Sequence, residues 1–228
     1  MAPRPIRRRR PRRAPPRRRH VGCGPPSAAC GTPCGRPRRT PVAHAQGCPD
    51  IEVVFARGTD EPPGLGRVGA AFVDSLRGRV GGRSVGTYAV NYPASFDFLA
   101  AAAGANDASL HIQYMMANCP RTRLVLGGYS QGAAVIDIIA AVPVPAVGFT
   151  APLPPNTPDF VAAIAVFGNP STKLGLPITA SPVWGSRAID LCNGADPVCS
   201  GGRDIAAHSN YGPGGFTDQA AAFVAGLV

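Results

Sequence analysis

From residue 48 onward, short apolar runs alternate with segments of helical character. Five runs rich in apolar and β-branched residues predict strands. They lie at 51–56, 85–90, 124–126, 161–167 and 188–191. Helical apolar spacing or high alanine content predicts helices at 66–80, 94–118, 133–140 and 216–227, with a break near Gly104 or Asn106 and a loop at 143–158. This alternation indicates a parallel sheet covered by helices on both faces.

One motif lies between a predicted strand and a predicted helix. Gly128-Tyr129-Ser130-Gln131-Gly132 has the G-x-S-x-G form of a nucleophile elbow. The two glycines remove side chains where strand and helix approach each other. The Ser130 hydroxyl is then left at a sharp turn on the carboxyl edge of the sheet. The alternative is a glycine-rich turn with an incidental serine, and the flanking apolar runs favour the nucleophile.

A serine hydroxyl needs an adjacent base to become a nucleophile. In this architecture the partners follow in the order serine, acid, histidine. Only His208, of the four histidines, comes after Ser130. Its segment, 208–212, is polar and glycine-rich and predicts a mobile surface loop. A solvated loop histidine is the alternative interpretation.

Five carboxylates separate the serine from that histidine. They are Asp137, Asp159, Asp190, Asp196 and Asp204. The first falls in a predicted helix and the second precedes a strand, so neither fits the role. Asp196 is the preferred orienting acid because it follows the last predicted strand inside a loop bounded by cysteines. Asp190 ranks second and Asp204 third, and a turn-forming role before Pro197 is the alternative for Asp196.

A serine nucleophile also forms a tetrahedral intermediate, which needs preorganised donors for its oxyanion. The backbone N–H of Gln131, directly after the serine, is one donor in such elbows. The loop after the first strand should supply the other, and Thr59 there offers both an N–H and a hydroxyl. A turn or capping role is the alternative for Thr59. The segments 143–149 and 174–178 are apolar and suit contact with an apolar part of a substrate or ordinary packing.

Four cysteines lie in 48–228, without metal-type spacing. We pair Cys192 with Cys199, which closes a short loop, and this leaves Cys48 with Cys119. Two disulfides indicate an oxidising compartment, and four free thiols are the alternative. Three further cysteines, Cys23, Cys30 and Cys34, precede this part of the chain.

Residues 1–47 differ in composition from the rest. They hold 13 arginines and no acidic residue, whereas 48–228 hold 10 Lys and Arg against 13 acids, a net charge of −3. Residues 48–228 therefore have no basic face for nucleic acid. We interpret 1–47 as a disordered, aberrant or mistranslated export signal, with a small-x-small cleavage pattern at Ala43-His44-Ala45. No run of 18 apolar residues predicts a membrane span.

In combination these residues resemble the cutinase-like serine esterases, over 48–228. The resemblance rests on Cys48-Pro49, 55–59, 128–132, the Cys192–Cys199 loop with Asp196, and His208 ahead of Tyr211-Gly212. It implies a three-layer α/β-hydrolase with a small, mostly parallel central sheet and no large lid. It also implies both disulfides, the triad Ser130–Asp196–His208, and an oxyanion hole from Thr59 and Gln131. Fungal members usually have serine where Thr59 stands, and threonine keeps the hydroxyl.

The expected function is that of a secreted, monomeric carboxylesterase for esters of short to medium acyl chains. Its partner is an ester or lipid substrate, with no nucleic acid, cofactor or metal. A lipase, phospholipase or acyltransferase with the same triad is the alternative. A non-catalytic protein that binds through its basic leader is the alternative from a different class.

Overall fold

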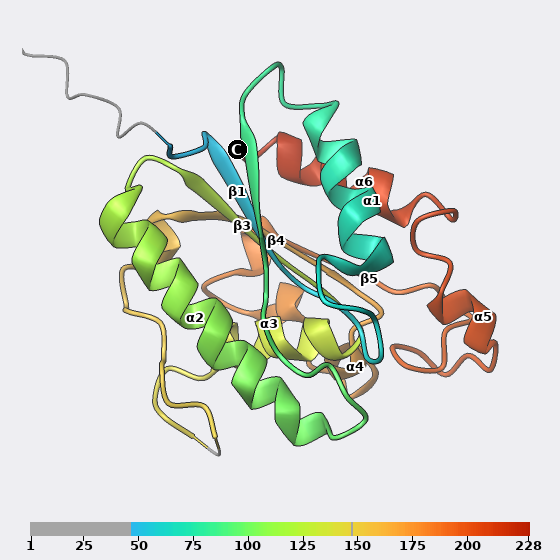
Figure 1. Cartoon of the computed structure of the whole chain (residues 1–228). Coiled ribbons are helices and arrows are strands. Elements are labelled where there is room, and N and C mark those ends of the chain that lie inside the picture. Colours follow the sequence, from blue (N-terminus) through green and yellow to red (C-terminus); the bar gives the residue numbers. More distant parts are fainter. Residues whose placement is uncertain (1–46, 147) are drawn as a thin grey trace, which may run out of the picture. The chain divides into compact units, whose positions relative to one another are not determined.

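A computed structural model describes residues 47–146 and 148–228, so the predictions made for the leader lie outside the described residues. A five-stranded sheet forms the centre, in the order β2-β1-β3-β4-β5, and every neighbouring pair is parallel (Figure 1). The strands are β1 (Ile51–Ala56), β2 (Val85–Ala89), β3 (Arg123–Tyr129), β4 (Val161–Phe167) and β5 (Ala188–Leu191). The predicted parallel sheet is therefore confirmed.

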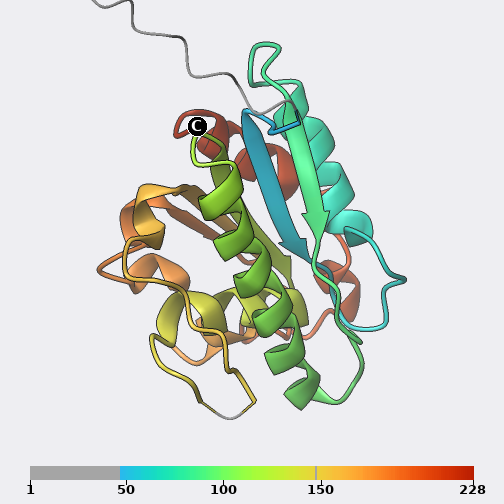
Figure 2. The ribbon, with the colours of Figure 1, turned by 60° about the vertical axis from the view of Figure 1, so that its left-hand side comes forward.

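Helices cover both faces of this sheet, which gives three layers. They are α1 (Gly66–Arg77), α2 (Ala101–Asn118), α3 (Gln131–Ala141), α4 (Pro170–Lys173), α5 (Ile205–His208) and α6 (Phe216–Ala225). Short 3-10 turns lie at Phe98–Ala100, Thr157–Asp159, Ile178–Ala180 and Gly185–Arg187. Figure 2 shows α2 in front of the sheet and α1 with α6 behind it. No helix among the described residues combines the length and the apolar character needed to cross a bilayer.

Alternation along the strands divides the core between the two faces. In β1, Val54 packs in the cluster formed with α2 and α3, whereas Val53 and Phe55 pack in the cluster formed with α1 and α6. Phe55 lies 6.4 Å from both Phe72 and Phe167, measured between ring centroids. All residues of β1 and β4 are buried. Central parallel strands covered on both faces appear as continuous apolar runs for this reason.

The helix predicted for 94–118 is shorter and has no break. It begins at Ala101 and continues through Gly104 and Asn106. Gly104 serves close packing, since a Cβ there would come 3.0 Å from side-chain atoms of both Tyr92 and Val135. The side-chain amide of Asn106 donates to the Gly148 carbonyl at 2.7 Å. Both residues that suggested a break therefore make tertiary contacts from within the helix.

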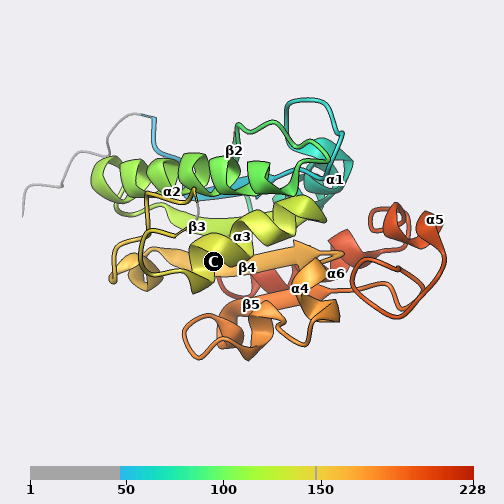
Figure 3. The ribbon, with the colours of Figure 1, turned by 90° about the horizontal axis from the view of Figure 1, so that it is seen from below.

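The strands all end at one edge of the sheet, and the site residues predicted from the sequence lie at this edge. Figure 3 shows α4 beside the head of the β4 arrow and α5 beyond its tip. The turn from β3 into α3 lies at the same edge, because β3 pairs in register with β4 up to Tyr129 and Phe167. Ligand sites of open α/β sheets lie outside this carboxyl edge.

Candidate active site

Ser130 occupies the turn between β3 and α3 in a strained backbone conformation. Its φ is 56° and its ψ is −119°, and such dihedrals persist only where the surrounding structure holds them. A Cβ on Gly128 would overlap the carbonyl of Gly132, and one on Gly132 would overlap the carbonyl of Ala56. The Ser130 amide donates to the Phe167 carbonyl at 2.9 Å. The sharp elbow expected from the motif is therefore present.

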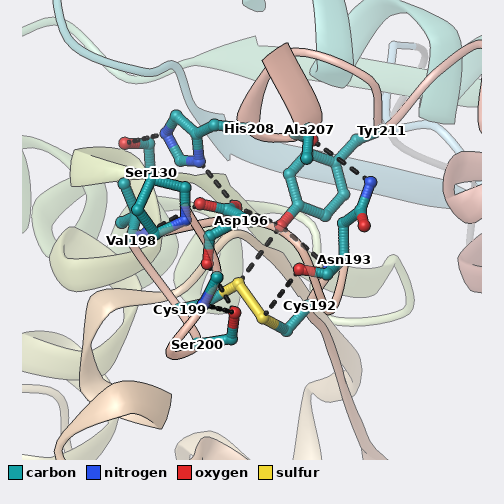
Figure 4. A network of polar contacts seen from close by, with 12 residues as sticks. Ser130, Cys192, Asn193, Asp196, Val198, Cys199, Ser200, Ala207, His208 and Tyr211 are labelled. Atoms are coloured by element: carbon teal, nitrogen blue, oxygen red, sulfur yellow. Dashed lines mark hydrogen bonds and ion pairs between the residues drawn. A yellow bond between two sulfur atoms is a disulfide. The ribbon is translucent and has the colours of Figure 1, made fainter. Parts of the chain in front are cut away.

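The side chains of Ser130, His208 and Asp196 form a continuous chain of hydrogen bonds (Figure 4). His208 Nε2 lies 2.9 Å from Ser130 Oγ, and Nδ1 lies 2.7 Å from Asp196 Oδ2. The Asp196 side chain is fully buried, and 13% of the imidazole side chain is exposed. An imidazole that gives its Nδ1–H to a carboxylate presents Nε2 to accept the serine proton.

The loop that carries Asp196 is closed by the Cys192–Cys199 disulfide, as predicted. Within the loop, Asp196 Oδ1 accepts a 2.7 Å hydrogen bond from the Val198 amide. The disulfide therefore restrains the loop, and the Val198 amide holds the carboxylate oxygen that does not contact His208. The second predicted disulfide, Cys48–Cys119, is also present and joins the start of β1 to the end of α2.

His208 is the last residue of α5, so the loop predicted around it begins only at Ser209. Asp204, the third-ranked acid, caps this helix by accepting a 2.9 Å hydrogen bond from the Ala206 amide. The imidazole packs on Gly168, whose φ is 57°, and a Cβ there would lie 2.9 Å from the ring. A capped helical turn and a glycine therefore set the orientation of the ring.

Asp190, the second-ranked acid, belongs to a different cluster. Its Oδ2 accepts hydrogen bonds from the side-chain amide of Asn169 at 3.0 Å and from the Thr172 hydroxyl at 2.9 Å. Burial raises the pKa of Asp190. Burial also raises the pKa of Asp137, on α3, to about 6, opposed by Ser171 and Asn169 and reinforced by the charge of Asp190. This cluster holds the turn between β4 and α4.

The loop that carries Thr59 lies beside the elbow. A Cβ on Gly58 would come 2.6 Å from the ring of Tyr129, so the loop packs on the residue before the serine. Gln131, directly after the serine, is buried and donates from its side-chain amide to the Ser95 carbonyl at 2.9 Å. The loops after β1 and β2 therefore contact the two residues that flank Ser130.

A buried arginine, without a role in the sequence analysis, anchors these two loops to each other. Arg57 donates to the carbonyl of Glu61 at 2.7 Å and to the carbonyl of Tyr92 at 2.8 Å. Its guanidinium also lies over the Tyr92 ring, 5.1 Å from the centroid. The Tyr92 hydroxyl in turn donates to the Arg57 carbonyl. The feature of the sequence that could have indicated this role is the position of Arg57, two residues before Thr59 in the loop predicted to supply an oxyanion donor.

Two tyrosines contact Asp196 and His208 through their hydroxyls, and the sequence analysis assigned neither tyrosine a role. Tyr211 donates to Asp196 Oδ2 at 2.6 Å, and Tyr129 donates to the His208 carbonyl at 2.6 Å. Burial raises the pKa of Tyr129 to about 12, with Glu61 adding to the effect. Burial raises the pKa of Tyr211 as well, followed by its hydrogen bond to Asp196. Both side chains are therefore protonated donors near neutral pH.

A cavity of about 620 Å³ lies beside the C-terminal half of α3. Its walls are mostly apolar and include Leu153, Leu176 and Trp184. Both segments suggested as acyl contacts contribute to it, through Pro143 and through residues 175–178. Ser130, Asp196 and His208 do not line it. The cavity is therefore separate from the hydrogen-bonded chain of these three residues.

The fold and the strained serine turn place the chain among the α/β-hydrolases. Residues 47–228 match the family model of the cutinases, and the chain belongs to this family. "Phospholipase Culp4" of Mycobacterium tuberculosis (strain ATCC 25618 / H37Rv) is 62% identical over 193 residues, which are 84% of either chain. "Probable carboxylesterase Culp3" of the same strain is 56% identical over 188 residues, 81% of this chain and 71% of that relative.

A solved relative agrees in fold. The cutinase of Trichoderma reesei, in complex with a C11Y4 phosphonate inhibitor, is 34% identical with a TM-score of 0.63, over 79% of this chain and 77% of that chain. The chain is therefore a cutinase-like serine ester hydrolase, as the resemblance implied.

Proposed function

We propose that the chain hydrolyses carboxylic esters through an acyl-enzyme, with Ser130 as nucleophile, His208 as general acid–base and Asp196 as orienting acid. The supporting observation is the unbroken chain of contacts at 2.9 Å and 2.7 Å. His208 accepts the serine proton as Oγ attacks the carbonyl carbon, then delivers it to the leaving alcohol. A water molecule, deprotonated by the same imidazole, then releases the acid and restores the serine.

The tetrahedral intermediate carries its charge on the former carbonyl oxygen. We assign its donors to the Gln131 amide, at the first position of α3, and to Thr59. The amide benefits from the partial positive charge at a helix N-terminus. Loss of one such donor typically costs about 3–4 kcal/mol of transition-state stabilisation.

Removal of the serine hydroxyl tests the assignment. Ser130→Ala should lower the turnover of p-nitrophenyl butyrate at least about 10⁴-fold, because no other group can form the acyl-enzyme. Ser75→Ala, on α1 behind the sheet, is the matched control and should keep its rate. Circular dichroism should show the same melting curve for Ser130→Ala as for the unaltered chain. Turnover that survives in a folded Ser130→Ala protein contradicts the proposal.

The substrate proposal is esters of short to medium acyl chains, with lipids as the second candidate. Three large apolar side chains are exposed on segments that lead to the site. Phe96 and Leu99 are each 76% exposed, and Ile205, on the helix that carries His208, is 69% exposed. Phe96 directly follows Ser95, which contacts Gln131. Such a rim suits a lipid aggregate, and one relative is named a phospholipase.

Product analysis separates these alternatives. A panel of p-nitrophenyl esters from C2 to C16 should peak at short to medium lengths. Release of fatty acid from phosphatidylcholine vesicles at a higher rate than from soluble esters would favour the phospholipase. Ester formation with added alcohols would favour acyl transfer, because the alcohol then replaces water in the second step.

We also propose that the chain is secreted and monomeric. Two disulfides among residues 48–228 support an oxidising destination. All proposed catalytic groups come from a single chain, so a second copy adds nothing to the chemistry. Sequencing the N-terminus of the protein from culture medium tests export, and a mature chain that begins at Met1 contradicts cleavage near Gln46. Light scattering on the purified protein tests the monomer.

A further inference from the structure

The hydroxyl of Tyr211 shares one oxygen of the catalytic carboxylate with the imidazole. It donates to Asp196 Oδ2 at 2.6 Å, and His208 Nδ1 lies 2.7 Å from the same oxygen (Figure 4). The hydroxyl accepts a 3.2 Å hydrogen bond from the Asn193 amide and lies 3.3 Å from Cys199 Sγ. The donor is thus held by the disulfide loop that also carries the carboxylate.

The ring of Tyr211 is buried and packs against three other aromatic rings. It is fully buried, with ring centroids 5.3 Å from Phe216, 5.8 Å from Tyr129 and 6.0 Å from Phe167. Burial and the contact with Asp196 raise the pKa of Tyr211 well above its usual range. The hydroxyl is therefore protonated near neutral pH and donates to the carboxylate.

We propose that Tyr211 is a positioning residue that draws charge from Asp196 and thereby sets the pH at which His208 becomes active as a base. This inference rests on the proposed function. A donor on a carboxylate disperses its negative charge, and a less charged neighbour stabilises the imidazolium less. With the Tyr211 hydroxyl in place, His208 should therefore act as a base at lower pH than it does in a chain without this hydroxyl.

Tyr129 provides a matched comparison within the same site. It is also buried, and its ring lies 5.0 Å from that of His208, but its hydroxyl donates to a backbone carbonyl. The charged groups that act on Tyr129 are Glu61, Arg67 and Asp196. The titratable groups that face Tyr211 are Asp196, His208 and Tyr129. Loss of the Tyr129 hydroxyl therefore loosens the histidine backbone without changing the charge on Asp196.

The experiment compares Tyr211→Phe and Tyr129→Phe in the full chain by the pH profile of kcat/KM for a soluble p-nitrophenyl ester. In Tyr211→Phe the acid limb, the pH range over which kcat/KM rises to its maximum, should move to higher pH by about 0.5 to 1 unit. The plateau value of kcat/KM should fall about tenfold. In Tyr129→Phe the plateau should fall while the acid limb stays in place. Titration with a reactive phosphonate counts the competent sites, so a partly misfolded fraction changes the amplitude and not the limb.

A second variant keeps the hydroxyl and changes only its acidity. Replacing Tyr211 by 3-fluorotyrosine gives a stronger donor, so the acid limb should move to lower pH, opposite to Tyr211→Phe. This variant decides the matter where Tyr211→Phe does not fold. An acid limb that stays in place in every folded variant at this position overturns the inference.

A failure of the role proposed for Tyr211 can be told apart from a failure of the proposed function. If the unaltered chain has no esterase activity, or Ser130→Ala is as active as the unaltered chain, the assignment of the triad fails. If the unaltered chain is active, Ser130→Ala is inactive and the limb does not move, the triad stands and only the role of Tyr211 is wrong.

Discussion

At the scale of single residues, Ser130 depends on groups that have no part in the chemistry. Its positive φ requires that the backbone around it be held in place, and two glycines make this possible by close contact. Gly132 packs on the end of β1, whose continuation leads to Thr59. The same contact that shapes the turn at Ser130 thus brings the loop with Thr59, our proposed oxyanion donor, beside it. Strain at such a site is maintained by the surrounding fold.

The side chain at position 59 should affect the rate and leave substrate affinity nearly unchanged. Thr59→Ala removes the hydroxyl that we assign to the oxyanion, and kcat for p-nitrophenyl butyrate should fall about 10²-fold. Thr59→Ser keeps the hydroxyl and loses only a methyl group, so it should retain most of the rate. Equal rates for the two variants would show that only the backbone N–H at position 59 contributes.

The buried acid on α3 should make stability depend on pH. The pKa of Asp137 is raised from 3.8 to about 6 by burial, so the folded state holds its proton more tightly than the unfolded chain. The stabilisation is complete below about pH 4 and is lost as pH rises through about 6, a change of about 2–3 kcal/mol. Asp137→Asn should therefore match the unaltered chain at pH 4 and be more stable at pH 8.

Urea unfolding at the two pH values measures this difference. Asp74→Asn, at a carboxylate whose side chain is 76% exposed, is the control and should show no comparable gain. If Asp137→Asn is less stable at pH 8 than the unaltered chain, the charged carboxylate contributes to stability and this interpretation is wrong.

At the scale of elements, the strands were predictable because burial on both faces leaves an uninterrupted apolar run. β4 and β5 have the predicted bounds. β3 begins earlier and ends later than predicted, because Arg123, Gly127 and Gly128 carry no apolar signal. Arg123 nevertheless pairs with β1, and the two glycines pair with both β1 and β4. α4 and α5 have four residues each, too few to show helical periodicity.

The proposed triad could be selected from the sequence because chain order left one histidine and few acids. Its supporting residues could not, since their roles arise from contacts across the fold. Tyr211 lies 15 residues from Asp196 and Tyr129 lies 79 from His208. Arg57 looks like a surface charge in the sequence, and only the carbonyl groups that converge on it explain its burial.

The two disulfides should differ in what they control. Cys192→Ser with Cys199→Ser frees the loop that holds Asp196, so kcat should fall at least about tenfold, through loss of the fixed carboxylate. Cys48→Ser with Cys119→Ser opens a loop with a separation of 71 residues, far from the serine. This pair should lower the free energy of unfolding by about 4 kcal/mol and leave kcat nearly unchanged at 25 °C. Equal losses of kcat in both pairs would contradict a specific role for the short loop.

At the scale of the whole molecule, charge and chemistry are carried by different parts of the chain. Residues 1–47 contain 13 arginines, whereas 48–228 have a net charge of −3. Every group in the proposed mechanism lies between Thr59 and His208. A net positive charge of the full chain therefore says nothing about the ester chemistry, and the acidic part has no electrostatic attraction to a polyanion.

Truncation separates the two parts. Residues 46–228 alone should hydrolyse p-nitrophenyl butyrate with kcat/KM within about twofold of the full chain, because no leader group takes part in acyl transfer. On immobilised DNA the shorter chain should pass unretained in low salt. Retention of the full chain, if present, should weaken steeply with added salt, as expected for arginine contacts with phosphates. Loss of esterase activity with the leader, or salt-dependent retention of 46–228, would show that the basic segment is part of the working enzyme.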